Sequence, residues 1–419
     1  MAFSFFMKLP RIKIVLRALR HRNYRLFFAG QLISLIGTWM QMVAQPWLVY
    51  RKAHSSFLLG AVGFAGQIPV FLLAFVGGTV ADRYNRHRMV IATQTASMIL
   101  AFILALLTLT GTVEIWHIFI LSLLLGVVNA FDMPGRQAFI VELVEKDDLM
   151  NAIALNSSIF NGARVLGPAV AGVLIAGIGE GWCFFANGVS YVAVIVCLSL
   201  MRLKPRGKAE AGKSGLSTVL EGFRYVQRTK PIRAVILLLG LISLAGMPYS
   251  VLMPIFADKI LHGGARGMGI LMGATGLGAL AGAMSLAARS GVRGLAKLIA
   301  YTSAGFGAAL ILFSISRSFW LSALLLLPVG FCFMVEMAAT NTLIQTMVPD
   351  RLRGRVMAVH VMTFMGMAPF GSIIAGSVAE KLGAPVALAL GGIACLAGSF
   401  LFATRLPQLQ TVKPRIDTN

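Results

Sequence analysis

Residues 57–80 read FLLGAVGFAGQIPVFLLAFVGGTV, and residues 81–88 continue ADRYNRHR. The first stretch carries no charged side chain, and an α-helix of that length crosses the hydrocarbon core of a bilayer, which takes about 20 apolar residues. The second stretch places one acidic residue and three arginines within eight residues. This alternation of an apolar span and a basic turn predicts the organisation of the whole chain.

The same pattern recurs along all 419 residues, of which 58% are hydrophobic and 12% charged, with a mean hydropathy of +0.82. Soluble domains carry about 25% charged residues, so a soluble class is excluded. We expect an all-α membrane protein with twelve transmembrane helices. They cover residues 26–49, 57–80, 88–110, 116–140, 152–178, 182–201, 232–256, 264–287, 296–316, 319–343, 356–379 and 384–404.

The chain divides at residues 202–231, which are rich in Lys, Gly, Ser and Arg and separate six expected spans from six. The basic start lacks the apolar core and cleavage site of a signal peptide, and its apolar residues predict an amphipathic helix on the membrane surface. Those residues are Ile12, Ile14, Val15, Leu16 and Leu19. We therefore expect an N-terminal cytoplasmic segment 1–25, a six-helix bundle 26–201, a cytoplasmic linker 202–231, a second bundle 232–404 and a cytoplasmic tail 405–419.

The 37 Lys and Arg residues, against 15 Asp and Glu, give a net charge of +22. With the N-terminus in the cytoplasm, thirty of them fall on the cytoplasmic side, and Arg164 falls inside a helix. Six fall outside: Arg51, Lys52, Lys259, Arg266, Arg317 and Lys381. This asymmetry predicts a multi-pass protein of the bacterial inner membrane with both termini cytoplasmic. It excludes nucleic acid as a partner, because the charges spread over a membrane face and form no groove with aromatic residues.

An internal repeat appears when the chain is shifted by 204 residues. Nine of the glycines between Gly30 and Gly188 then find a glycine partner, where chance predicts about two. The pairs are Gly60/Gly264, Gly63/Gly267, Gly78/Gly282, Gly126/Gly330, Gly162/Gly366, Gly167/Gly371, Gly172/Gly376, Gly179/Gly383 and Gly188/Gly392. Two pseudo-symmetric six-helix halves of parallel orientation resemble the major facilitator transporters, whose substrate site lies between the halves.

The turn after residue 77 resembles the major facilitator signature G-x-x-x-D-R-x-x-R-R. Its matching residues are Gly78, Asp82, Arg83, Arg86 and Arg88, with His87 interrupting the basic pair. We expect a gate in which the glycine allows close helix contact, the aspartate accepts from a facing helix N-terminus, and the arginines bind carboxylates of the other half. The alternative is cytoplasmic positive charge alone, which does not explain the aspartate.

Residues 163–172 are similar to the antiporter motif G-x-x-x-G-P-x-x-G-G, through Arg164, Gly167, Pro168 and Gly172. Small residues there predict tight packing against the opposite half, and the proline predicts a bend. Generic packing of small residues is the alternative. Ser122 stands where many antiporters have an arginine, so proton coupling through that arginine is absent.

Further segments resemble the transmembrane secretion effector branch of this superfamily, which includes the enterobactin exporter and macrolide efflux proteins. They are residues 22–25 (RNYR), 28–34 (FAGQLIS), 37–41 (GTWMQ), 44–50 (AQPWLVY), 131–139 (FDMPGRQAF) and 151–156 (NAIALN). The resemblance covers nearly all of the first half and, more loosely, the second. That branch carries chemically unrelated substrates, so the resemblance leaves the cargo open.

Charged residues inside the membrane are costly and mark functional sites. Asp132 and Glu336 occupy matching places in the two halves and are candidates for proton coupling or substrate binding; His360 is a weaker one. Asp132 has a structural alternative, a salt bridge to Arg164, Arg83 or Arg136. For Glu336 we expect a position facing the central cavity. Further polar residues are expected to line that cavity or to bond a neighbouring helix: Gln41, Gln45, Asn129 and Asn341.

These observations predict a secondary transporter that exports a small amphipathic molecule, of drug or siderophore type, by proton-driven alternating access as a monomer in the lipid bilayer. The sequence has no ATP-binding loop, nucleophile arrangement, metal-ligand cluster or paired cysteines, so we expect no enzyme, metal or cofactor beyond the proton gradient. An importer or lipid flippase of the same fold, or a non-transporting sensor or scaffold, stays open as an alternative.

Overall fold

The structure is a computed structural model that describes residues 16–203, 216–289 and 291–404. Over these ranges it consists of helices without strands, and all twelve expected transmembrane spans are present. The predicted tail and parts of the predicted N-terminal segment and linker lie outside the described residues. The first half contains η1 (Arg17–Arg20), α3 (Arg22–Ala53), α4 (Ser56–Arg83), α5 (Arg86–Leu109), α6 (Ile115–Leu143), η2 (Lys146–Asp148), α7 (Leu149–Ile178) and α8 (Glu180–Ser199).

The second half follows helix α9 (Leu216–Arg228), which lies within the expected linker. Its seventh span is assembled from four pieces and contains two prolines, Pro248 just before α11 and Pro254 within it, which lack a backbone N–H for the helix. Two of those pieces are π-helical turns. The elements are α10 (Lys230–Leu241), η3 (Ile242–Gly246), α11 (Tyr249–Ile255), η4 (Phe256–Ile260), α12 (Gly264–Ala287), α13 (Leu295–Ile315), α14 (Phe319–Met347), α15 (Asp350–Leu382) and α16 (Ala384–Ala403).

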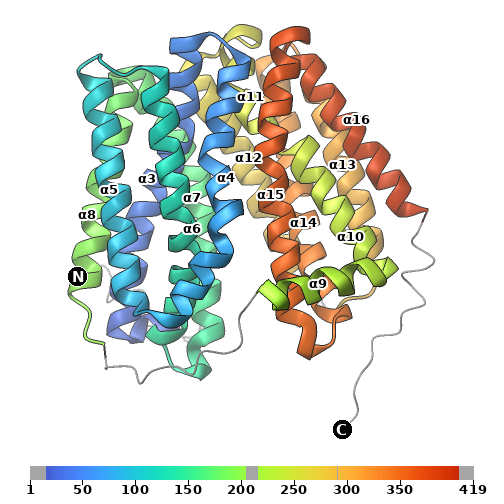
Figure 1. The fold of residues 1–419 in the computed structure, drawn as a ribbon. Helices are drawn as coiled ribbons and strands as arrows, with labels where there is room; N and C mark the ends of the chain where they lie inside the picture. Colours follow the sequence, from blue (N-terminus) through green and yellow to red (C-terminus); the bar gives the residue numbers. More distant parts are fainter. Residues whose placement is uncertain (1–15, 204–215, 290, 405–419) are drawn as a thin grey trace.

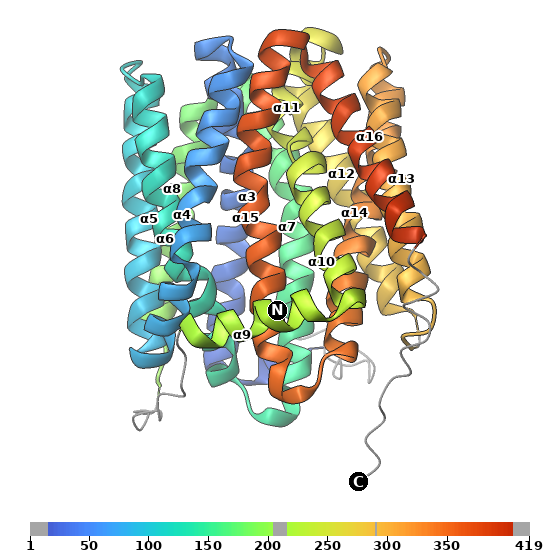
Figure 2. The same ribbon diagram turned by 45° about the vertical axis from the view of Figure 1, so that its right-hand side comes forward.

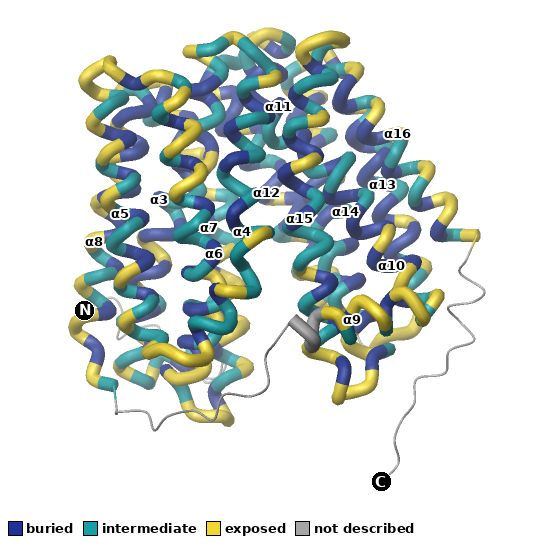
Figure 3. Tube along the Cα trace, in the orientation of Figure 1, coloured by how far each residue is buried: buried dark blue, intermediate teal, exposed yellow. Residues whose placement is uncertain are grey.

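The two bundles stand side by side, as Figure 1 shows, converging at the top and diverging toward the bottom. We call the bottom the linker end, because α9 lies across it and the described chain before α9 ends there (Figures 1 and 2). The top is the distal end, where α3 meets α4 and α15 meets α16. Exposed positions follow the outward helix faces (Figure 3) and include large apolar side chains such as Leu72 and Phe400, as expected for faces in contact with lipid.

The expected repeat is visible in the packing of the helices. A shift of 204 residues carries α4 onto α12, α5 onto α13, α7 onto α15 and α8 onto α16. In the first half α4 packs on α6 and α5 on α8, and in the second half α12 packs on α14 and α13 on α16. The two halves are therefore structural repeats of each other.

Two equivalent crossings join the halves: α4 packs on α15, and α7 packs on α12. Glycine backbones touch at both. A Cβ atom at Gly376 would lie 3.0 Å from the Cα of Gly60, and one at Gly172 would lie 2.9 Å from the Cα of Gly269. Real side chains do not fit at such distances, so these crossings depend on glycine.

We predict that Gly60→Ala weakens the contact between the halves. The added methyl group would overlap the carbonyl oxygen of Ser372, and overpacking of this kind costs about 1–3 kcal/mol. The thermal melting temperature of the purified protein should fall. Gly162→Ala is the matched control, because a Cβ there meets nothing within 4 Å and alanine favours the helix. Equal melting temperatures for the two variants would contradict the packing argument.

Candidate functional site between the two halves

The predicted gate residues lie at the linker end, and their described ion pairs and hydrogen bonds stay within their own half. Asp82 is 59% exposed, and its nearest described ion-pair partner is Arg86, 3.7 Å away. The Arg86 guanidinium donates to the Glu142 carboxylate of α6 at 3.0 Å and to the carbonyl of Ala138 at 3.3 Å. The expectation that this arginine binds a carboxylate of the other half is therefore wrong in this conformation, because the halves have separated at this end. Arg83 and Arg88 are exposed.

The close helix contact predicted for Gly78 is made by its neighbour. A Cβ at Gly78 would meet nothing within 4 Å, whereas one at Gly77 would overlap the carbonyl oxygen of Ala130 on α6. One residue rotates the helix face by about 100°. The gating role of the segment stays a prediction.

Asp132 is a satisfied carboxylate inside the first half. It accepts from the Thr93 hydroxyl at 2.7 Å and the Gln94 amide at 2.9 Å, and it pairs with Arg136 at 3.0 Å. Arg136 also donates to Gln31 of α3 at 2.9 Å. Of the alternatives for Asp132, the structure thus contains the Arg136 salt bridge, which ties α3, α5 and α6 together.

Glu336 has the opposite environment. Its side chain is 1% exposed, one carboxyl oxygen accepts from the Thr340 hydroxyl at 3.1 Å, and the other has no hydrogen-bond partner among the described residues. The expectation that Glu336 faces the central cavity is wrong in this conformation, because its side chain is enclosed within the second half. His360 of α15 is also buried, and within the described structure neither ring nitrogen has a partner.

Arg164 lies between the halves. Its guanidinium carbon is 5.6 Å from the ring centroid of Trp39 on α3 and 5.8 Å from that of Phe333 on α14. All three residues are near the middle of their helices. No described carboxylate pairs with this guanidinium. A half-buried cation between aromatic faces of both halves is therefore the most distinctive group at this interface.

The small residues around Arg164 divide their contacts between two helices. Gly172 approaches Gly269 of α12, which confirms the expected packing against the opposite half. A Cβ at Gly167 would instead overlap Trp39 of α3 in its own half, and the backbone of Pro168 lies against Gly269. This part of α7 therefore packs against both α3 and α12.

Two of the four expected cavity-lining side chains bond neighbouring helices instead. The Asn187 amide of α8 donates to Gln41 at 2.6 Å, and the Gln45 amide donates to Ser122 of α6 at 2.6 Å. Asn129 and Asn341 are half-buried, and their lining of a cavity stays a prediction.

A polar contact that the sequence did not reveal closes the distal end. One Glu380 carboxyl oxygen of α15 accepts from the backbone N–H groups of Ser56 at 2.6 Å and Phe57 at 3.1 Å, and from the Ser55 hydroxyl at 3.1 Å. A carboxylate of one half thus caps the first turn of α4 in the other, where free N–H groups and the helix dipole favour negative charge. We call this contact the distal cap.

A second hydrogen bond joins the halves at the same end. The Tyr50 hydroxyl of α3 donates to Asp258 of η4 at 3.0 Å. Within the described residues, the hydrogen bonds between the halves are the Tyr50–Asp258 bond and those of the distal cap. The only sequence signal for them is a pair of acidic residues close to predicted span ends, which does not identify their partners.

Asp148 is a second residue that the sequence analysis missed. Its carboxylate is fully buried and pairs with Arg17, with Arg20 at 2.8 Å and with His21 at 2.7 Å. The start of the described chain is thereby fixed to the loop before α7 at the linker end. The predicted amphipathic segment thus ends in a turn docked on the first bundle, with Ala18 buried.

Comparison with known proteins gives a family match to transmembrane secretion effectors over residues 15–416. The staphyloferrin A transporter of Staphylococcus aureus is 27% identical over 389 residues, which cover 92% of this chain and 97% of the relative. The multidrug efflux pump Tap of Mycolicibacterium fortuitum is 26% identical over 83% of this chain and 87% of its own. The enterobactin exporter EntS of Shigella boydii is 26% identical over 80% of each chain.

Solved structures agree on the fold. The crystal structure of the nucleoside transporter NupG superposes with a TM-score of 0.75 over 93% of this chain and all of its own, at 12% identity. Likeness at this level of identity indicates the fold and leaves the cargo open.

We predict that Glu380→Gln shifts the protein toward a state that is open at the distal end. A neutral amide loses the charge-assisted part of the distal cap, about 1.5–3 kcal/mol, and about 1.4 kcal/mol is a tenfold change in population. Spin labels at Thr112 and Ser318, one in each half, should show a larger share of long distances by double electron–electron resonance. Lys381→Gln, the next residue, is the control. An unchanged distance distribution in Glu380→Gln would show that the cap does not hold this end closed.

Proposed function

This chain belongs to the transmembrane secretion effector family of the major facilitator transporters, and we propose on that basis that it exports a small amphipathic organic anion by proton-driven alternating access. The observation that supports this proposal is the position of Arg164 between the halves. The names of two relatives, a multidrug efflux pump and an enterobactin exporter, agree with the proposed direction.

The cargo class follows from the surroundings of Arg164. A cation in the middle of a membrane protein is costly unless an anion or a polar cavity accompanies it. No described carboxylate pairs with this guanidinium, and its nearest ring neighbours are Trp39 and Phe333. A carboxylate or other oxyanion on an apolar body would supply the missing charge while its body contacts the aromatic faces.

The conformation is consistent with a cargo-loading state. The described hydrogen bonds between the halves lie at the distal end, whereas the gate residues Asp82 and Arg86 at the linker end are separated from the second half. The charge distribution of the sequence predicts that the linker end is cytoplasmic. Arg164 would then be reached from the cytoplasm, and release would require the distal cap to break.

Coupling to protons is assigned to Glu336. A buried carboxylate that lacks a cation pays a large desolvation cost when it is ionised, and protonation removes that cost. Glu336 is three residues from Phe333 on α14, so it lies one helical turn from the ring that contacts Arg164. A shift of α14 on cargo release would therefore change the surroundings of both groups.

We predict that Arg164→Gln reduces export of an anionic probe at least tenfold, because a charge-assisted contact of about 1.5–3 kcal/mol is lost. In cells that lack other efflux pumps, accumulation of carboxyfluorescein, an anion, would be compared with that of ethidium, a cation, with and without a protonophore. Arg164→Lys should keep part of the activity, and exposed Arg266→Gln should keep all of it. Protonophore-sensitive export of ethidium alone, uptake of carboxyfluorescein, or movement of neither probe would contradict the proposal.

We predict that Glu336→Gln abolishes export driven by a pH gradient while exchange of probe between the two sides persists. The amide keeps the volume of the protonated carboxyl but cannot release a proton. Inside-out vesicles would measure both processes with carboxyfluorescein, and exposed Glu145→Gln is the control. If gradient-driven export is unchanged in Glu336→Gln, the carboxylate is structural.

A further inference from the structure

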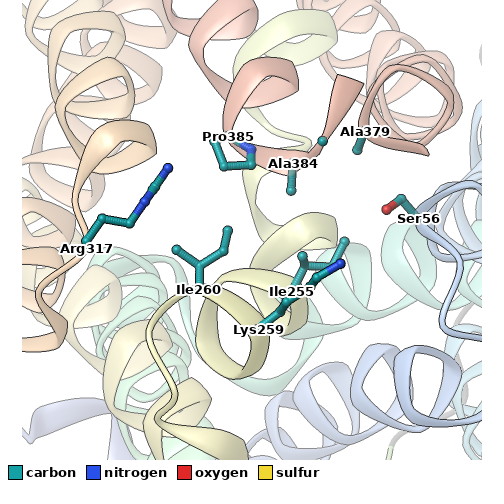
Figure 4. A pocket seen from close by; sticks show the side chains of 9 residues that line it. Ser56, Ile255, Lys259, Ile260, Arg317, Ala379, Ala384 and Pro385 are labelled. Atoms are coloured by element: carbon teal, nitrogen blue, oxygen red, sulfur yellow. The ribbon is translucent and has the colours of Figure 1, made fainter. Parts of the chain in front are cut away.

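A pocket of about 380 Å³ opens at the distal end beside the distal cap. The end of the seventh span forms its floor, and the turn before α14 and the start of α16 form two of its walls. Figure 4 shows Arg317 at one side, Ser56 at the other and Lys259 between them. Its volume falls in the range of small-molecule sites, which is about 300–1,000 Å³.

We propose that this pocket binds an oxyanion carried on a small apolar body. Its charged lining residues are both cations, Lys259 and Arg317. The sequence places only six Lys and Arg residues on this side of the membrane, and two of the six meet in one pocket. Two cations thus share one pocket on the membrane side where the sequence predicts few Lys and Arg residues.

The two nearby acidic residues accept hydrogen bonds elsewhere and form no described ion pair with Lys259 or Arg317. Asp258 accepts from Tyr50, and Glu380 accepts from the start of α4. Lys259 forms no ion pair with any described residue. Arg317 uses one terminal nitrogen for the carbonyls of Ser314 and Ser316, both at 3.2 Å, which leaves its other N–H donors for a ligand.

The remaining lining defines the body of the ligand. Ile255, Ile260 and Pro385 give the pocket an apolar wall beside the cations. An inorganic ion alone would leave that wall uncovered, whereas an oxyanion with a short apolar portion would contact both. A phospholipid of the outer leaflet and a soluble organic anion both carry an oxyanion next to an apolar portion, so the pocket could bind either.

The pocket also spans the two halves. Ser56 belongs to α4 of the first half, and the other lining residues belong to the second half. A ligand that contacts both sides would bind the distally closed state in preference to an open one. The pocket lies at the distal end of the protein, away from Arg164, and ligand binding there does not require the proposed export.

The test uses the purified full chain and follows its melting temperature by tryptophan fluorescence. Phenyl phosphate in detergent at constant ionic strength probes the soluble source. Nanodiscs of phosphatidylglycerol against nanodiscs of phosphatidylcholine probe the lipid source. The variants are Lys259→Gln, Arg317→Lys and the double variant Lys259→Gln/Arg317→Gln. Lys52→Gln and Arg266→Gln are matched controls, because both residues are exposed and belong to the same predicted membrane side.

We expect at least one anionic probe to raise the melting temperature of the unaltered protein and of both controls by about 2–5 °C. The double variant should lose most of that rise, and Arg317→Lys should keep part of it. A rise with phenyl phosphate alone identifies a soluble anion as the ligand, and a rise with phosphatidylglycerol alone identifies a lipid. An equal rise in the double variant, or no rise in the unaltered protein with either probe, would overturn the proposal.

Discussion

The close approach of glycine backbones where α4 crosses α15 and α7 crosses α12 is the constraint on which the rest of the structure depends. Lipid tails are as apolar as leucine, so membrane helices gain little from hiding apolar surface against each other, and close contact of small residues holds them together instead. The crossings are related by the internal repeat, and at each one the backbones of two glycines come together. Contact between glycine backbones leaves few interlocked side chains, which would suit the change in relative angle that the proposed alternating access requires.

The charged groups within the bundles differ in which half supplies their partners and in whether they have a partner of opposite charge. Asp132 is bonded to three residues of its own half and therefore belongs to the rigid part of the molecule. Glu380 is bonded across the halves, so its contacts exist only while the distal end is closed. Glu336 and Arg164 have no partner of opposite charge among the described residues. An incompletely satisfied charged or titratable group is costly in a membrane protein, and these two are accordingly the groups assigned to the transport cycle.

The sequence was sufficient for the architecture and insufficient for the side-chain partners. Span positions follow from runs of apolar residues, and the repeat follows from glycine spacing; both can be read from the order of residues along the chain without knowing which side chains meet. Partners depend on helix rotation, and one residue of register moved the close contact from Gly78 to Gly77. The same limit applies to Glu336. It occupies the same position in the repeat as Asp132, but the repeat does not predict that Asp132 has three polar partners and Glu336 only one among the described residues. The distal cap was beyond prediction, because it joins residues more than 320 positions apart.

The two crossings connect the central cation to the distal cap mechanically. Helix α7 carries Arg164 at its middle and Gly172 at the crossing with α12, so both move as one element. Helix α15 carries Gly376 at the other crossing and Glu380 in the cap, one helical turn apart. In the proposed alternating access, a rotation of one half against the other would change the distance between Phe333 and Arg164, and the crossings would transmit that rotation to the cap. Because such coupling would be reciprocal, a ligand that favours one arrangement of Trp39, Arg164 and Phe333 would change the stability of the cap by the same free energy by which the cap changes the binding of that ligand.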